Sequence, residues 1–290
     1  MSNSVLYGLT VVIWGSTWLA IEYQLGVVAP EVSIVYRYAL AAAVLFLYCL
    51  IRGLSLTFNV KQHVWFVFLG LLLFCLNYVF AYRAQVHITS ALAAIAFSTM
   101  LWMNIILSRI LFGTRAGARV IVGAFLGIAG LFVIFAPQIG EVSFDDAVLY
   151  GSALAMLGAL TASIGNMVSQ AAQKAALPVV QANAWGMLYG AILTGLIAFS
   201  QGHEYRFDAT FTYIASLLYL AVFGSVVAFG AYLTLLGRIG AHRAGYATVM
   251  FPVVALILSI LFEGLSLSMT IVFGTSLVLL GNLLVLKEKR

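Results

Sequence analysis

Long apolar runs alternate with short polar interruptions along this chain of 290 residues. The runs are continuous instead of alternating between apolar and polar positions, which favours helices over the strands of a membrane barrel. One helical crossing of a bilayer core about 30 Å thick takes roughly 20 residues. Charge clusters and prolines delimit ten predicted spans at residues 5–21, 32–51, 64–82, 90–111, 119–136, 148–170, 179–200, 211–235, 244–262 and 269–286. We therefore expect an all-α integral membrane protein with ten transmembrane helices.

Composition narrows the class further. Apolar residues make up 64% of the chain and charged residues 8%, whereas soluble domains carry roughly 25% charged residues. This excludes a soluble enzyme and an ordinary nucleic-acid binder, despite the net charge of +5. The residues before Val5 carry no charged side chain, so the first span is expected to be retained and not cleaved as a signal.

The charged residues separate by alternate loops. One set of loops and ends holds eleven of the fourteen basic residues and one acid, Glu288. The other holds the remaining eight acids together with Arg37, Arg83 and Arg206. Because loops rich in Lys and Arg stay in the cytoplasm, we expect both termini to be cytoplasmic in a multi-pass protein of the inner membrane.

The two halves of the chain resemble each other. Ala81-Tyr82 recurs as Ala231-Tyr232, and Leu111-Phe112 recurs as Leu261-Phe262, both 150 residues later. Further matches in the same order are Tyr7-Gly8 with Tyr150-Gly151, Pro30 with Pro178, Met100 with Met250, and Gly123 and Gly130 with Gly274 and Gly281. We expect two five-helix units, residues 1–140 and 141–290. A unit with an odd number of spans must be inverted in its second copy, as in many secondary transporters.

Several motifs resemble the EamA family of the drug/metabolite transporter superfamily. They are Trp14-Gly15-Ser16-Thr17-Trp18, Pro30 with Arg37, Thr89-Ser90-Ala91-Leu92-Ala93-Ala94, Pro252, and Phe262-Glu263-Gly264. The resemblance covers essentially the whole chain and implies a transporter, usually an exporter of small metabolites, with a central cavity between the halves. Trp102 and Gly113 depart from the repeat, because Pro252 and Glu263 stand at the matching positions.

Candidate binding residues come from helical spacing, since residues four apart share a face. Such faces carry Trp14 with Trp18, Phe74 with Tyr78 and Tyr82, and Ser98 with Trp102. If these faces point inward, their side chains form an aromatic cavity for amphipathic solutes. If the same side chains are belt or packing residues, they anchor the helices instead. Pro252 frees a carbonyl near Tyr246 to Thr248. The predicted substrate-binding set is Trp14, Trp18, Tyr78, Tyr82, Ser98, Trp102, Asn166, Tyr232, Tyr246 and Pro252.

Ionisable groups offer few further sites. Arg37 lies within a span, where a charge is costly unless it is paired or hydrated. It would either capture a substrate carboxylate or, as we favour at this stage, pair with Glu22 or Glu31. We name Arg37 and Glu22 as ionic or gating candidates, and read Glu263 as a helix cap. No Asp or Glu lies near the middle of a predicted span, which counts against proton exchange through a carboxylate there. The remaining alternatives are coupling of transport through Glu22 and uncoupled facilitated diffusion.

These observations predict a monomeric carrier that exports small metabolites by alternating access, with aromatic or hydrophobic amino acids as the first solute class. A nucleotide-sugar or sugar-phosphate exchanger is the alternative, although it would need several cavity cations. An integral-membrane lipid-modifying enzyme is a third possibility that would need clustered carboxylates or a nucleophile with a base. Cys49 and Cys75 fall inside spans and give no metal pattern, so neither a cofactor nor a metal is expected.

Overall fold

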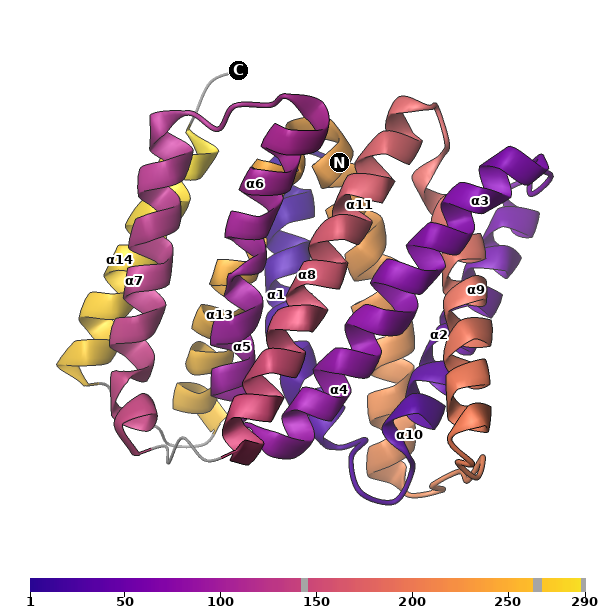
Figure 1. The fold of residues 1–290 in the computed structure, drawn as a ribbon, viewed down its shortest axis with the longest axis horizontal. Coiled ribbons are helices and arrows are strands. Elements are labelled where there is room, and N and C mark those ends of the chain that lie inside the picture. The colour runs from indigo at the N-terminus through magenta and orange to yellow at the C-terminus, as the bar shows by residue number, and fades with distance from the viewer. Residues whose placement is uncertain (142–145, 263–267, 288–290) are drawn as a thin grey trace.

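The computed structural model describes residues 1–141, 146–262 and 268–287, and every regular element among them is helical (Figure 1). In chain order the elements are α1 (Asn3–Glu22), α2 (Pro30–Ile51), α3 (Val60–Leu69), η1 (Gly70–Leu76), α4 (Asn77–His87), α5 (Ser90–Ser98), α6 (Met100–Phe112), α7 (Ala118–Glu141), α8 (Asp146–Lys174), α9 (Val179–Ser200), α10 (Phe211–Tyr219), η2 (Leu220–Val227), α11 (Ala228–Ile239), α12 (Ala241–Ala244), α13 (Ala247–Phe262) and α14 (Met269–Leu286).

Helices occupy all ten segments in which the sequence predicts spans. Within the described ranges, nine are long enough and apolar enough to cross a bilayer. The exception is α13, which has 16 residues. The protein is therefore a multi-pass membrane protein, and the tenth crossing stays a prediction.

Local sequence explains where the helices begin. Asn59 forms a capping box with Gln62, in which each side chain accepts a hydrogen bond from the other residue's backbone N–H. Thr89, Thr210 and Ser268 each accept a backbone N–H at the start of α5, α10 and α14. Pro30 occupies the first turn of α2, where its missing N–H costs little. Side chains close in sequence thus cap the starts of α3, α5, α10 and α14 without tertiary contacts.

Two π-helical segments interrupt long helices. η1 lies between α3 and α4, and η2 lies between α10 and α11; they begin 150 residues apart. Each π turn adds a residue to the helical repeat and rotates the face that follows. The apolar pattern did not predict either segment.

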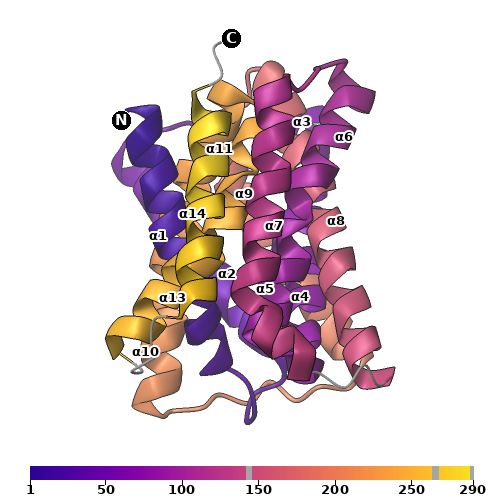
Figure 2. The ribbon, with the colours of Figure 1, turned by 90° about the vertical axis from the view of Figure 1, so that its left-hand side faces the viewer.

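The helix pair α7 and α14 forms one side of the bundle (Figures 1 and 2). The pair is held by glycines: a Cβ on Gly123 would lie 2.6 Å from the Gly281 carbonyl oxygen, and one on Gly130 would lie 2.6 Å from that of Gly274. The helices run antiparallel and touch through their backbones, a contact that small residues permit in membranes.

Both termini lie at the same end of the bundle (Figure 1). The helix ends at that level carry Arg52, Lys61, Arg109 and Arg119, whereas Glu22, Glu31 and Asp208 lie at the opposite level. The charge separation predicted from the sequence is therefore present between the two ends of the fold. The side of the membrane that each end faces stays a prediction.

The α7–α14 contact yields a prediction. We expect Gly123→Ala to lower the free energy of unfolding by about 1–3 kcal/mol, because the new methyl group overpacks a backbone contact. The matched control is Gly8→Ala in α1, where a Cβ meets no atom within 4 Å. Thermal unfolding in detergent compares the two variants, and equal melting temperatures would contradict the packing argument.

Candidate functional site

A cavity lies among α1, η1, α4, α5, α6, α8, α11 and α13. Its wall consists of Trp14, Thr17, Trp18, Ile21, Leu73, Asn77, Tyr78, Ala81, Phe97, Met100, Ala162, Asn166, Phe229, Tyr232, Thr248 and Phe251. Centres of water-sized spheres can occupy about 80 Å³ of it. One water needs ~10–15 Å³ by this measure, so the cavity has room for a compact solute or several waters.

Aromatic rings make up one wall. The ring centroid of Trp14 lies 4.8 Å from that of Phe229, 5.0 Å from that of Tyr232 and 5.6 Å from that of Phe251. Trp14 Nε1 donates to the carbonyl oxygen of Gly224 at 2.9 Å. This bond fixes the indole, because a buried Trp N–H needs an acceptor.

A buried polar network adjoins the aromatic rings through Tyr232. Asn166 Nδ2 donates to the Tyr232 hydroxyl at 3.0 Å and to Asn104 Oδ1 at 3.3 Å. Ser163 also donates to Asn104 Oδ1, at 2.7 Å. Asn104 itself does not line the cavity, so it orients Asn166 from behind.

Five of the ten predicted binding residues line this cavity: Trp14, Trp18, Tyr78, Asn166 and Tyr232. The other five are placed elsewhere. Solute binding by any of them stays a prediction, but the structure corrects the expected position of the second group.

Two of the misplaced residues belong to the first half. Tyr82 is buried and donates to Gln24 Oε1 at 3.0 Å. The expected ladder of Phe74, Tyr78 and Tyr82 is wrong as an inward face, because the positions that face the cavity along η1 and α4 are Leu73, Asn77 and Ala81. Tyr78 reaches the wall from the edge of this face.

The strip of Ser98 and Trp102 is also wrong as a cavity face. Thr99 separates α5 from α6, so the two residues do not lie on one continuous helix. Ser98 donates to the Ile95 carbonyl oxygen at 2.6 Å. Trp102 packs on Phe125 of α7 with ring centroids 4.5 Å apart.

Tyr246 and Pro252 lie next to cavity residues without joining them. The Tyr246 hydroxyl lies 3.2 Å from the carbonyl oxygen of Gly123 and 3.1 Å from that of Val278, between α7 and α14. Pro252 is buried within α13. Because it lacks an N–H, the Thr248 carbonyl four residues earlier loses its helical donor, and Thr248 lines the cavity.

Arg37 is fully buried between α2, α4 and η2. Its Nε donates to Ser225 Oγ at 2.9 Å, and its Nη2 donates to the Tyr78 hydroxyl at 3.4 Å. The guanidinium carbon lies 4.6 Å from the Tyr78 ring centroid. The expected pairing with Glu22 or Glu31 is therefore wrong: Glu22 is exposed at the end of α1, and Glu31 has another partner.

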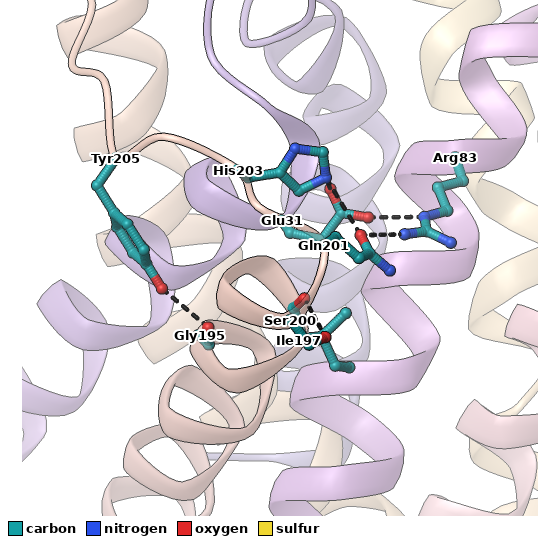
Figure 3. Close-up of polar contacts among 8 residues, drawn as sticks. All are labelled: Glu31, Arg83, Gly195, Ile197, Ser200, Gln201, His203 and Tyr205. Atoms are coloured by element: carbon teal, nitrogen blue, oxygen red, sulfur yellow. Dashed lines mark hydrogen bonds and ion pairs between the residues drawn. The ribbon is translucent and has the colours of Figure 1, made fainter.

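Glu31, in the first turn of α2, belongs to a polar cluster (Figure 3). Its carboxylate, 2% exposed, accepts from Arg83 Nε at 2.6 Å and lies 3.5 Å from His203 Nε2. Arg83 Nη2 donates to Gln201 Oε1 at 2.7 Å. We call Glu31, Arg83, Gln201 and His203 the outer cluster; it links α2, α4 and the segment after α9. Glu263, predicted as a cap, lies outside the described residues.

Sequence reasoning did not single out Phe97, Phe229 and Phe251 or the supporting Asn104. Phe229 precedes Tyr232 by three positions, and this helical spacing with a known candidate is a signal that could have found it. Phe97 and Phe251 come from interrupted or proline-containing helices, where the face cannot be read from spacing.

A second cavity of about 380 Å³ lies between α1, α2, α9 and α11. It touches the other face of α11, through Val227, Gly230 and Thr234. Its lining is mostly aliphatic and lacks the paired aromatic and polar walls. We therefore take the first cavity as the candidate functional site.

Comparison with known proteins identifies the family to which the chain is similar. The profile of the EamA-like transporter family matches residues 3–136 and 149–287. A solved crystal structure superposes with a TM-score of 0.79 over 98% of this chain and 96% of that chain, at 19% sequence identity. That likeness concerns the fold.

Curated relatives share about a quarter of their residues with this chain. The uncharacterized transporter YoaV of Bacillus subtilis is 26% identical over 93% of this chain and 91% of its own. The uncharacterized inner membrane transporter YedA of Escherichia coli is 26% identical over 94% and 89%. A probable amino-acid metabolite efflux pump of Escherichia coli is 25% identical over 88% and 84%.

The outer cluster yields a prediction. We expect Arg83→Gln to destabilise the protein by about 1–2 kcal/mol, because the buried Glu31 carboxylate loses its ion-pair partner while the exposed side of Arg83 limits the effect. Thermal unfolding measures the change.

A double variant controls this experiment. Combining Arg83→Gln with Glu31→Gln removes the orphaned charge and is expected to recover part of the lost stability. A double variant whose loss equals the sum of the single losses would show that the ion pair contributes nothing.

Proposed function

The chain belongs to the EamA-like transporter family, and on this premise we propose that it exports small metabolites as a secondary carrier, with aromatic or hydrophobic amino acids or related amphipathic solutes as substrates. The observation that carries the proposal is the cavity, whose lining combines the aromatic rings around Trp14 with the polar side chain of Asn166. Such a site suits a solute with an apolar body and polar groups. The relative named as a probable amino-acid metabolite efflux pump supports this solute class.

The transport mechanism is alternating access by two inverted five-helix units, residues 1–140 and 141–290, with ten crossings in all. Three observations support the division: the family profile matches residues 3–136 and 149–287, the π segments begin 150 residues apart, and the glycine contacts are reciprocal. Gly123 corresponds to Gly274 in the repeat, and Gly130 corresponds to Gly281. When each residue is replaced by its counterpart in the other unit, the Gly123–Gly281 contact therefore becomes the Gly130–Gly274 contact. An axis in the membrane plane relates antiparallel helices in this way.

The outer cluster is a contact that such motion would break and remake. Glu31 and Arg83 lie in the first unit, whereas Gln201 and His203 lie in the second. Polar bonds between units at one end hold that end closed while the other opens. The cavity helices also come from both units, so rocking of one unit against the other would change access to it.

The orientation follows from the basic end. We propose that the end with the termini faces the cytoplasm of a cell whose inner membrane holds the protein, because Lys and Arg near helix ends are retained inside. The cavity is formed within one chain, which supports a functional monomer. No carboxylate pair or nucleophile with a base belongs to its wall, so we expect the solute to cross unmodified.

Transport by the aromatic wall can be tested in proteoliposomes. We expect purified protein to exchange labelled L-phenylalanine or L-leucine in a counterflow assay and to release the solute unchanged. Trp18→Ala should lower the initial flux at least tenfold, because Trp18 lines the cavity and packs on Phe97 with centroids 5.4 Å apart.

Trp102→Ala is the matched control, since Trp102 packs against α7 away from the cavity. Its flux should stay within twofold of the parent protein. The cavity assignment fails if Trp102→Ala loses flux and Trp18→Ala keeps it, and a covalently altered product without flux would favour an enzyme.

Orientation can be measured with reporter fusions. We expect a green fluorescent protein fused after Arg290 to fluoresce, because that reporter folds in the cytoplasm. Alkaline phosphatase fused after Gln201 should be active, since it requires the periplasm. The reverse pattern would overturn the proposed orientation.

A further inference from the structure

Arg37 is a buried cation without a buried anion. Among the described residues no carboxylate oxygen lies within 4 Å of its guanidinium, and Glu31, the acid nearest in sequence, is engaged by Arg83. Arg37 Nη1 has no hydrogen-bond partner and is shielded from solvent. The hydroxyls of Ser225, Tyr78 and Tyr82 and the rings of Tyr38 and Tyr78 provide its surroundings.

This arrangement is energetically incomplete. An ionised group taken out of water is costly unless it is paired and fully hydrogen-bonded. Contacts with tyrosine rings and neutral hydroxyls offset part of that cost. A guanidinium carries five N–H donors in a planar fork that matches a carboxylate, so an anion that reaches Arg37 would complete its bonding.

The cavity is one side chain away from Arg37. Tyr78 lines the cavity and accepts the 3.4 Å hydrogen bond from Arg37 Nη2, a long bond that another acceptor can replace. Thr17 also lines the cavity, and a Cβ on Gly224 would lie 3.0 Å from its methyl carbon and 3.2 Å from Arg37 Nη2. When Arg37 donates to the Tyr78 oxygen, the Tyr78 proton remains for donation.

An acceptor lies beside these donors. Asn77 precedes Tyr78 and lines the cavity, and its Oδ1 is buried without a hydrogen-bond partner. Its Nδ2 donates to the Leu73 carbonyl at 3.4 Å. The same region of the wall therefore offers an uncompensated positive charge, a hydroxyl donor and an unused amide acceptor.

We infer that the cavity binds its solute as a zwitterion, with the carboxylate held by Tyr78 and Arg37 and the ammonium by Asn77. The inference rests on the proposed function and specifies which groups of an α-amino acid are recognised. A single cation matches one carboxylate better than a phosphate dianion. Arg37 and Tyr78 thereby select for the negative charge, whereas the rings of Trp14 and Phe229 contact the apolar side chain.

The experiment compares two ligands that differ in the carboxylate. Binding of L-phenylalanine and of L-phenylalaninamide to the full chain in nanodiscs is followed by tryptophan fluorescence, because Trp14 and Trp18 line the cavity. The variants are Arg37→Gln and Tyr78→Phe. Tyr7→Phe is the matched control, since Tyr7 is buried in α1, donates to Asn282 Oδ1 at 3.0 Å and does not line the cavity.

We expect Arg37→Gln and Tyr78→Phe to raise the dissociation constant for L-phenylalanine at least tenfold and to leave that for the amide within twofold. Tyr7→Phe should change neither. Tyr78→Phe keeps the test decisive if Arg37→Gln fails to fold. Equal losses for both ligands, unchanged affinity for L-phenylalanine, or tighter binding of the amide by the parent protein would overturn the inference.

Failure of the inference and failure of the proposed function give different results. If the parent protein shows counterflow of neutral solutes but not of L-phenylalanine or L-leucine, the zwitterion inference is wrong and the proposed carrier function stands. Counterflow of glucose 6-phosphate in preference to both amino acids would identify a phosphate as the anion and overturn the carboxylate assignment. If no solute shows counterflow, both the proposed carrier function and the zwitterion inference are wrong.

Discussion

Hydrocarbon supplies no hydrogen-bond partners, and this constraint governs the whole molecule. Every backbone amide within the bilayer must be bonded inside the protein, so each membrane segment is helical. Departures from regular helix are tolerated where neighbouring groups or a cavity satisfy the backbone. The interruptions at η1, η2, Thr99 and Pro252 all adjoin cavity residues. The irregular backbone and the candidate site therefore coincide for a physical reason.

The same constraint makes side-chain polarity informative. Most polar groups around the cavity are bonded: Trp14 to Gly224, Asn166 to Tyr232, and Ser163 to Asn104. Against this background Arg37 Nη1 and Asn77 Oδ1 stand out because they have no partner. The Glu31 carboxylate pairs with Arg83 in the outer cluster and does not neutralise Arg37.

Close packing joins the two proposed units as well as the helices around the cavity. The α7–α14 pair is fixed by backbone contacts at Gly123 and Gly130, which leave no space for side chains. Because α7 lies in the first proposed unit and α14 in the second, this pair anchors one unit to the other on its side of the bundle. The cavity helices combine aromatic and polar contacts with close contacts at small residues, such as Gly15 of α1 against Val254 of α13.

Apolar run length and charge placement in the sequence were sufficient to predict the helical segments, their boundaries within several residues, and the family resemblance, because these depend on local composition and on the bilayer thickness. Helical spacing also identified Trp14, Trp18 and Tyr78 as candidates. It failed for Ser98 and Trp102 because Thr99 breaks the helix between them, and for Tyr82 because the cavity face of α4 runs through Asn77 and Ala81. The contacts of Arg37 with Ser225 and Tyr78 depend on how α2, α4 and η2 pack. Only the tertiary structure decided that Glu31 pairs with Arg83, since residues distant in sequence compete for one carboxylate in three dimensions.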